Sequence, residues 1–510
     1  MKKQQTRTYA LLASFCVLLV TMMMLTTANF AEDAKQAGTI KEKLDKIFND
    51  SKYDNAFWGV RVEDAAGNVV YHKNGQKQFM PASNMKVFTS AAVLDTLGED
   101  YRYETRVDSL GTVRNGALNG DLIIVGSGDP SLGAWHPDDK SGSARLFAKW
   151  AREVRKAGIT RVHGRIIGDG RIFTKEYYNG DWVISDVPYW YAAGTSGLAI
   201  EENAFRVYIS PGRKEGDPAK LRVVPQTDYF KVVNQTKTVA AGKDTTADVV
   251  WRAPESNVIY VSGNVAIDRK TYRERGTVWN SPLYAAHMFK AALEKEGIEV
   301  GGKAINVLSL QKRELEGIDY AQRKAVVTHF SEPLSELVKQ VNKISHNLFA
   351  DQMYRTLAVE TGRKGSYAGG AEAVKDWMKR IGVPNYGQAM IFDGSGLARR
   401  NHYQPQQMTH ILRYMATKSL AKKAFYDSLP VGGVDGSLWK RMKQEGVKGK
   451  VHAKTGYIGY VRTLSGYIDA EPGKPKYIFS FMCNHYTVPT REVNESQNNA
   501  CAVLALDGAE

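Results

Sequence analysis

Strand-type patterns stand at both ends of this chain, with helical patterns between them, and this order limits the folds that the chain can adopt. Apolar and polar residues alternate through 57–74 on both sides of an Ala-Ala-Gly-Asn turn, which predicts a β-hairpin. The stretches 449–470 and 476–486 predict adjacent antiparallel strands near the other end. We therefore predict an α+β domain in which one antiparallel sheet, flanked by helices, is assembled from segments far apart in the sequence.

Helical periodicity fills much of the chain between these strands. Apolar residues recur at helical spacing through 85–97, shortly after Pro81. The same spacing returns in later stretches, namely 281–297, 334–345, 347–360 and 370–382. In contrast, 101–278 contains short strand-type runs separated by Gly, Pro and Asn, so we expect one or two mainly β domains to be inserted there.

Length, composition and charge narrow the class of protein. A chain of 510 residues with 43% apolar content is long enough for two or three packed domains. Its formal net charge is +15, but Lys and Arg are scattered, which argues against an arm that binds nucleic acid. Outside the cytoplasm such a charge would draw the protein weakly to polyanionic surfaces such as a cell envelope, although ordinary solubility explains it equally well.

The beginning of the chain has the pattern of a secretory signal. Three basic residues precede the apolar run 9–28, which ends in small residues. We therefore expect residues 1–31 to direct the protein to the periplasm or another extracytoplasmic compartment. An uncleaved membrane anchor is the alternative, because the run approaches the length of a bilayer-spanning helix. In an oxidising compartment Cys483 and Cys501 could pair, and two unpaired thiols are equally compatible with the sequence.

Ser83 and Lys86 form a candidate nucleophile and base. Their Ser-x-x-Lys spacing places them on one face of the first turn of a predicted helix. The pattern alone is not specific, because it also begins at Ser309, Ser419 and Ser437. A serine hydrolase that uses lysine as its base needs the pKa of that lysine to fall, which burial beside another cation produces. The sequence should therefore supply a second lysine and polar groups that relay protons.

Two further motifs meet this requirement in order along the chain. The only Lys-Thr-Gly motif begins at Lys454, on a predicted strand where glycine permits a substrate to approach closely. Ser-x-Asn occurs three times, beginning at Ser262, Ser345 and Ser496. The Ser262 copy lies within a strand-type run, and the Ser496 copy follows the Lys-Thr-Gly motif. We therefore select Ser345 and Asn347, because this copy lies between two predicted helices.

This ordered triple resembles the signature of the penicillin-recognising serine hydrolases. Several stretches are also similar to the D-alanyl-D-alanine carboxypeptidase/endopeptidase family, the low-molecular-mass class C penicillin-binding proteins. They are GSGDPSLG, GTSGLAIEENAF, SHNLFADQMYRTL, FDGSGLARRN, LPVGGVDGSLWKRM and VHAKTG with LSGYI. The resemblance covers nearly all of the chain after the signal. It implies a penicillin-binding/β-lactamase-like transpeptidase domain built from 32–100 and 279–510, with mainly β inserted domains in 101–278.

The resemblance implies a role for each motif residue. Ser83 would attack the D-Ala-D-Ala carbonyl and become acylated, with Lys86 acting as its base. Ser345 would relay a proton to the leaving amine, and Asn347 would orient the acyl-side amide. Lys454 would help to lower the pKa of Lys86 and would set the electrostatics of the pocket.

Further residues would bind the substrate on the same resemblance. Thr455 would help to hold the peptide, Gly456 would permit its close approach, and the backbone N–H groups of the nucleophile and of Tyr457 would bind the oxyanion. Arg399 and Asp169 match positions that in relatives help to read a diaminopimelate side chain. Many relatives carry Ser or Thr in place of Tyr457, so the choice between a free C-terminal D-Ala and an internal crosslink stays open.

Two polar residues near these motifs are predicted to act structurally. Asp393, in an Asp-Gly-Ser-Gly segment, is expected to shape a tight turn. His346, inside the Ser-x-Asn motif, is expected to pack or to form hydrogen bonds, because the family needs no histidine there.

We therefore predict a serine-type D-Ala-D-Ala carboxypeptidase or endopeptidase that acts on peptidoglycan peptides and binds β-lactams. No metal and no other cofactor is expected, because the histidines show no metal-ligand spacing. Peripheral association with the membrane or cell wall is expected rather than binding to nucleic acid, and both a homodimer and a monomer fit the sequence. Two alternatives remain: a β-lactamase or esterase on the same scaffold, and a penicillin-sensing or wall-binding protein without turnover.

Overall fold

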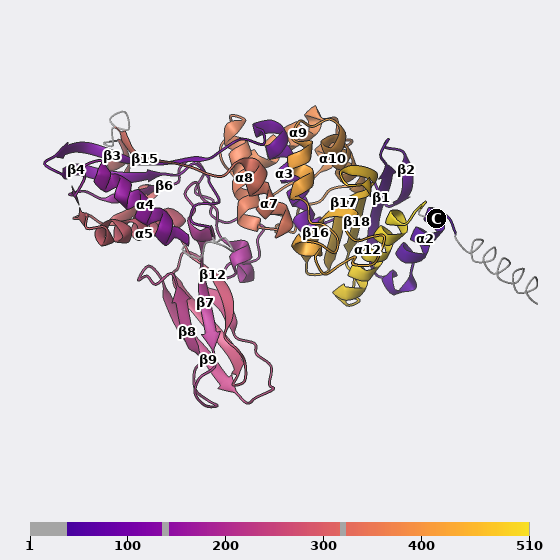
Figure 1. Ribbon diagram of the computed structural model, residues 1–510, viewed down its shortest axis with the longest axis horizontal. Coiled ribbons are helices and arrows are strands. Elements are labelled where there is room, and N and C mark those ends of the chain that lie inside the picture. Colours follow the sequence, from indigo (N-terminus) through magenta and orange to yellow (C-terminus); the bar gives the residue numbers. More distant parts are fainter. Residues whose placement is uncertain (1–37, 135–141, 317–322, 509–510) are drawn as a thin grey trace, which may run out of the picture.

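A five-stranded antiparallel sheet is built from both ends of the chain in the computed structural model, which describes residues 38–134, 142–316 and 323–508 (Figure 1). The strands are β1 (Phe57–Asp64), β2 (Val69–Lys73), β16 (Val451–Ile458), β17 (Val461–Glu471) and β18 (Lys474–Asn484), in the spatial order β16-β17-β18-β1-β2. Trp58 of β1 pairs with Cys483 of β18, which confirms that distant segments share one sheet. The predicted signal, residues 1–31, lies outside the described residues.

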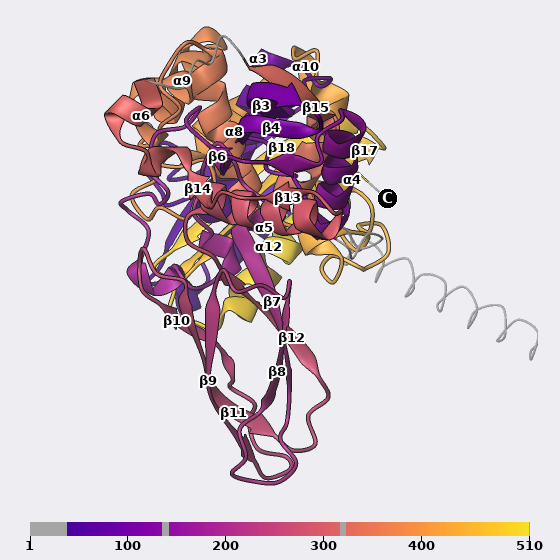
Figure 2. The same cartoon turned by 90° about the vertical axis from the view of Figure 1, so that its left-hand side faces the viewer.

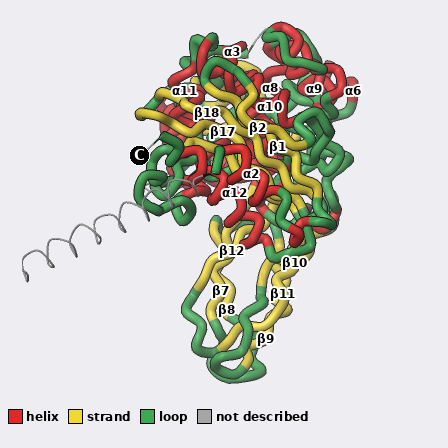
Figure 3. Tube along the Cα trace, turned by 90° about the vertical axis from the view of Figure 1, so that its right-hand side faces the viewer, coloured by secondary structure: helices red, strands yellow, loops and turns green. Residues whose placement is uncertain are grey.

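Helices cover both faces of this sheet. α2 (Ile40–Phe48) and α12 (Thr490–Ala505) lie together on one face, which Figure 3 shows toward the viewer. The opposite face carries α3 (Met85–Leu97), α7 (Leu334–Lys343), α8 (Asn347–Glu360), α9 (Tyr367–Arg380), α10 (Pro405–Thr417) and α11 (Lys422–Ser428). Side chains of β18 alternate between the two cores: Met482 packs with α3 and α10, whereas Phe481 packs with α2 and α12. Among the described residues, no helix combines the length and apolar character needed to cross a bilayer.

The helix that follows the predicted nucleophile has no face exposed to water over most of its length. All residues of α3 from Met85 to Leu94 are buried, because the sheet and the surrounding helices enclose it. A lysine near the start of such a helix has little access to water. The fold therefore desolvates Lys86 through its position alone.

The two cysteines of the described residues are both buried and free. Cys483 lies on β18 and Cys501 on α12. Of the two alternatives that the sequence left open, the structure shows the unpaired thiols. Burial raises the pKa of both thiols, so neither has the character of a reactive cysteine.

A second group of sheets is inserted after α3. Its seven-stranded sheet contains β3 (Glu104–Arg114), β4 (Ala117–Val125), β5 (Arg161–Val162), β6 (Ile166–Asp169), β13 (Glu299–Val300), β14 (Ala304–Asn306) and β15 (Lys324–Phe330). The helices of this part are α4 (Gly142–Lys156), α5 (Ser281–Lys295) and the short α6 (Lys312–Glu316). Two three-stranded sheets project from it (Figures 1 and 2). They are built from β7 (Ala204–Ser210), β8 (Lys220–Val224), β9 (Lys231–Val239), β10 (Asp248–Arg252), β11 (Val258–Ala266) and β12 (Tyr272–Thr277).

Strand pairing carries this second group of sheets beyond the boundary expected at residue 278. β13, β14 and β15 follow that boundary, yet they pair with β5, β6 and β3. The chain then returns beside the point where it left, because Leu334 N donates to Tyr101 O and Ser331 N donates to Tyr103 O. We therefore propose that the inserted part comprises 104–330 rather than 101–278.

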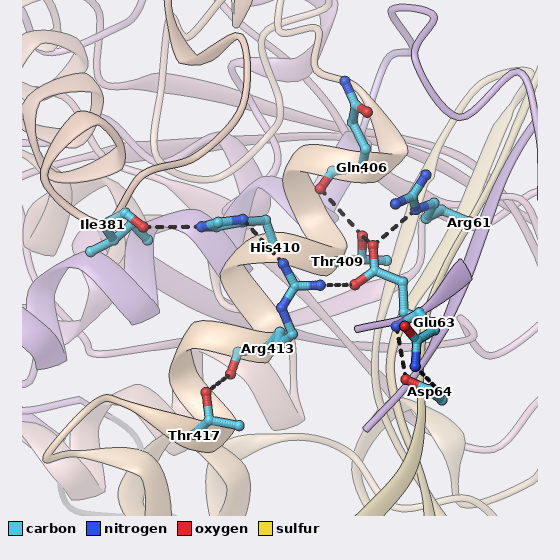
Figure 4. A network of polar contacts seen from close by, with 10 residues as sticks. Arg61, Glu63, Asp64, Ile381, Gln406, Thr409, His410, Arg413 and Thr417 are labelled. Atoms are coloured by element: carbon cyan, nitrogen blue, oxygen red, sulfur yellow. Dashed lines mark hydrogen bonds and ion pairs between the residues drawn. The ribbon is translucent and has the colours of Figure 1, made fainter. Parts of the chain in front are cut away.

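A buried carboxylate joins the five-stranded sheet to its helical layer (Figure 4). Glu63 of β1 is 2% exposed and accepts hydrogen bonds from Arg61 Nε and Thr409 Oγ1, both at 2.9 Å. It also forms an ion pair with Arg413 of α10. A carboxylate at this depth is stable only with such partners, so the group ties β1 to α10.

Replacing Glu63 by alanine is expected to lower the free energy of unfolding by about 3 kcal/mol, because two arginines would lose their common partner in a poorly hydrated place. Denaturant-induced unfolding followed by tryptophan fluorescence measures the change. Glu471→Ala serves as the control, since it removes an exposed ion pair with Lys474 and should alter the free energy little. Equal effects of the two variants would contradict the assignment.

Candidate active site

Ser83 and Lys86 face one another at the start of α3. Ser83 lies in a 3₁₀ turn, Ala82–Asn84, that leads directly into the helix. Ser83 was predicted to lie in the first turn of the α-helix, but it lies just before that helix, in the tighter 3₁₀ turn. The expected proximity holds: Lys86 Nζ donates a hydrogen bond to Ser83 Oγ at 3.1 Å.

Lys86 is fully buried among oxygen acceptors. Its ammonium also donates to Asn347 Oδ1 and to the carbonyl oxygen of Ser395, both at 2.6 Å. Burial lowers the pKa of Lys86 to about 8, and the negative charges of Asp351 and Asp393 oppose this shift only in part. A lysine with this pKa can act as a base near neutral pH, which an ordinary lysine cannot.

Two aspartates that the motifs do not include set this environment. Asp393 accepts hydrogen bonds from the N–H groups of Gly396 and Ala398 at 2.7 Å each, which confirms that it shapes a tight turn. Asp351 of α8 accepts from Ser395 N at 3.1 Å, and burial together with Asp393 raises the pKa of Asp351 to about 8. Burial thus brings the ionisation of Asp351 and of Lys86 toward the same neutral range.

The loop between α7 and α8 brings the second motif to the third. Lys454 Nζ, on β16, donates to Ser345 Oγ at 2.8 Å and to Thr455 O at 2.7 Å. Burial lowers the pKa of Lys454 well below its ordinary value, and the charges of Lys86 and Arg462 lower it further. Ser345 has φ of 60°, a conformation that costs energy for a non-glycine residue and that aims its side chain at Lys454.

Gly456 allows β16 to lie against the turn that carries the nucleophile. A Cβ atom at this position would lie 2.1 Å from Thr463 Oγ1 and 2.7 Å from Pro81 O. The side chain of Thr463 and the backbone of the nucleophile turn fill the space beside Gly456, and the approach of a substrate there stays a prediction. Thr463 Oγ1 adds a hydrogen bond to Pro81 O at 2.8 Å. Tyr457, the next residue of β16, is about half exposed at the rim.

The two predicted carboxylate-reading residues lie in different places. Arg399 is exposed, and its guanidinium lies 3.8 Å from where a Cβ of Gly459 would be, beside the turn between β16 and β17. Asp169 ends β6 in the inserted sheet, where it forms an ion pair with Arg171 at 2.7 Å and accepts from Arg171 N at 3.0 Å. Within the described residues, the structure brings Arg399 to the Lys-Thr-Gly hairpin and engages Asp169 with its own neighbour.

Two contacts at the site were not predicted from the sequence motifs. Ser437 Oγ lies 2.8 Å from Thr455 Oγ1, although its Ser-x-x-Lys pattern counted only as a chance copy. Asn347 Nδ2 donates to Tyr191 O, in the inserted part, at 2.7 Å. Over the part of the chain that the structure describes, no group of three or more His, Cys, Asp or Glu side chains is arranged to hold a metal ion.

The sequence of this chain matches a known protein family over most of its length. Residues 40–505 match the sequence pattern of the D-Ala-D-Ala carboxypeptidase 3 (S13) family. The chain belongs to this family. It is 30% identical over 498 residues to the D-alanyl-D-alanine carboxypeptidase of Actinomadura sp. (strain R39), a match that covers 95% of this chain and 88% of that protein.

Solved structures give the same result for the fold. The crystal structure of penicillin binding protein 4 (dacB) from Haemophilus influenzae superposes with a TM-score of 0.77 at 25% sequence identity, covering 91% of this chain and 99% of that one. The same protein in complex with a β-lactam gives a TM-score of 0.71 at 25% identity, with 91% and 99% covered. The predicted family, the predicted penicillin-binding fold and the predicted class, a peptidase, are therefore confirmed for this S13 chain.

Proposed function

We propose that this S13 peptidase cleaves D-Ala-D-Ala bonds of peptidoglycan peptides through an acyl-enzyme on Ser83. One observation carries the proposal: a fully buried lysine with its pKa lowered to about 8 donates to the Ser83 hydroxyl at 3.1 Å. A second buried lysine and a serine stand on the other side of the same site. This is the set of groups that serine acylation requires.

The residues divide the acylation step among them. Neutral Lys86 accepts the Ser83 proton while Oγ bonds to the carbonyl carbon, and the N–H groups of Ser83 and Tyr457 bind the resulting oxyanion. The proton that Lys86 took from Ser83 is relayed through Ser345, held by Lys454, to the departing D-Ala amine, so the C–N bond breaks without releasing an anion. Asn347 and Thr455 orient the peptide. Water then cleaves the Ser83 ester, which returns the serine and a shortened peptide.

A β-lactam would enter the same path and stop part-way. Opening of its amide ring by Ser83 forms the same kind of ester, but the amine stays attached to the acyl group and does not leave. The solved relative from Haemophilus influenzae in complex with a β-lactam supports this use of the pocket. The exposed Arg399 supplies positive charge, and the Lys454 amine a hydrogen-bond donor, for the carboxylate that peptide and drug share.

The family acts on the cell wall, so we place the protein outside the cytoplasm, with residues 1–31 as its export signal. A role on peptidoglycan also fits the net charge of +15, since the envelope is polyanionic. Cleavage of a terminal D-Ala and cleavage of a crosslink follow the same chemistry, so the proposal includes both substrates.

Labelling with a fluorescent penicillin, followed by incubation with a diaminopimelate pentapeptide, tests the proposal. We expect a durable label on the protein and release of D-alanine from the peptide. Rapid loss of the label would instead indicate a β-lactamase. A durable label without peptide turnover would indicate a penicillin-sensing protein.

The acylation rate is expected to rise with pH and to level off above about pH 8. Lys86 must be neutral to accept the proton, and burial lowers its pKa to about 8, so protonation removes the base below that pH. The second-order rate constant for penicillin labelling should fall about tenfold for each pH unit below 8. Stopped-flow measurements between pH 6 and 9, corrected for penicillin hydrolysis without enzyme, give the profile. A flat profile would mean that another group is the base.

A further inference from the structure

The Ser345–Asn347 loop is held from the side of the inserted part. Asn347 Nδ2 donates to Tyr191 O at 2.7 Å, as noted above. His346, between the two motif residues, contacts Glu202, with Nε2 and Oε2 3.0 Å apart. Tyr191 and Glu202 both belong to the inserted part, more than a hundred residues earlier in the chain. Ser345 and Asn347 therefore each have a hydrogen-bond partner on another segment, and His346 has Glu202 as its close neighbour.

Four side chains form a closed ring at this contact, which we call the Glu202 ring: the buried Glu202 and His346 and the partly buried Trp190 and Arg275. Arg275 of β12 lies 3.1 Å from Glu202 Oε2 through Nη1, and its guanidinium stands 3.6 Å from the centre of the Trp190 ring. Trp190 meets His346 edge to face at 5.5 Å. Each member thus contacts two others, so the position of His346 is fixed from two directions.

The charge on Glu202 is maintained at this depth. Burial raises its pKa, but the contact with His346 and the positive charges of Arg275 and Arg206 outweigh that effect and lower the pKa to about 2. Glu202 is therefore an anion at every pH at which the enzyme would work. The titratable and charged groups that face it come from the loop before α8, from β7 and from β12: His346, Arg206 and Arg275.

The backbone on both sides of this contact is strained. Glu201, Glu202 and Asn203 have φ of 51°, 61° and 52°, and Ser345 has φ of 60°. Each such residue adopts a conformation that costs energy and persists only where its surroundings impose it. Strain of this kind gathers where a side chain must be held in one direction. Here it stands on the segment that supplies Glu202 and on the serine that faces Lys454.

We propose that Glu202 is a positioning residue that, through His346, holds the Ser345–Asn347 loop in the geometry needed for acylation. The proposal rests on the proposed function, since it assumes that Ser345 and Asn347 act in that step. The inserted part then contributes directly to the chemistry. Without the carboxylate, the loop loses its anchor at its middle residue, and Ser345 and Asn347 move away from Lys454 and Lys86.

Glu202→Gln, which keeps the shape and removes the charge, tests this role. We expect the acylation rate constant for penicillin to fall about tenfold, while the dissociation constant of the initial non-covalent complex changes less than twofold. Glu201→Gln is the matched control: it is an adjacent buried glutamate with positive φ, but Ser143 N and Tyr284 OH, both in the inserted part, donate to it. This control should acylate at the wild-type rate.

A double-mutant cycle separates positioning from general damage. If Glu202 acts through His346, the variant carrying Glu202→Gln and His346→Gln should acylate no more slowly than the slower single variant. Multiplied effects, an effect of Glu201→Gln equal to that of Glu202→Gln, or a Glu202→Gln rate within twofold of the wild type would overturn the proposal. Failure of the proposed function would look different, since the wild-type protein itself would then take up no durable label.

Discussion

Ser83→Ala is expected to abolish covalent labelling by penicillin. The hydroxyl oxygen is the atom that bonds to the acyl group, and alanine offers no replacement. Fold and stability should be unchanged, because Ser83 is only partly buried and the side-chain hydrogen bond that it loses is the one from Lys86. Gel fluorescence after incubation with a fluorescent penicillin, together with intact-protein mass, measures the loss.

A control for this result lies within the chain itself. Ser309 begins another Ser-x-x-Lys pattern, but it is exposed in a 3₁₀ turn of the inserted part and has no buried lysine beside it. Ser309→Ala should therefore label like the wild type. Label retained by Ser83→Ala would show that a different residue is acylated, and peptide mapping of the labelled protein would identify it.

Lys86→Met is expected to slow acylation by about a thousandfold, within the range typical for loss of a general base. Methionine matches the length of lysine and fits a buried site, but it has no group that accepts the Ser83 proton. Loss of the ammonium leaves three oxygen acceptors without their donor, so the variant should unfold at a somewhat lower temperature than the wild type but remain folded during the assay. Time-resolved labelling and thermal unfolding give both values from one preparation.

Lys312→Met provides the comparison, since Lys312 completes the Ser309 pattern far from the site. It should leave the acylation rate unchanged. Should Lys86→Met acylate within tenfold of the wild type, the base would have to be sought at Lys454, the other buried lysine.

Contacts between residues close in the sequence could be predicted from their spacing. Contacts between residues far apart could be predicted only from the order of the motifs along the chain. Ser83 and Lys86 are three residues apart, so helical spacing sufficed to bring them together. Ser345 and Lys454 are 109 residues apart, and no periodicity relates them; the family resemblance supplied that contact. Asp351 lay outside prediction for a different reason. Its effect depends on the depth of α8, which emerges only when helices and sheet are packed.

The C-terminal boundary that we propose for the inserted part could not be predicted from local sequence patterns either. β13 has two residues and β14 three, too few for alternation to show, and α5 before them resembles the helices of the other layer. The pairing partners β5 and β6 lie far upstream. For Asp169 a motif match suggested substrate binding; the structure shows its carboxylate paired with Arg171, and the binding role stays a prediction.

The strand order of the five-stranded sheet has a consequence for how the protein is made. β1 pairs with β18, so residue 57 reaches its partner only when residue 484 has been synthesised. Until then one edge of β1, the strand that carries Trp58, Val60 and Val62, has no partner. The five-stranded sheet on which the active-site helices pack is incomplete. While the polypeptide is being synthesised or exported, this edge of β1 therefore stays unpaired until β18 has emerged. A product truncated before β18 would keep β1 as an unpaired edge strand that can pair with another chain.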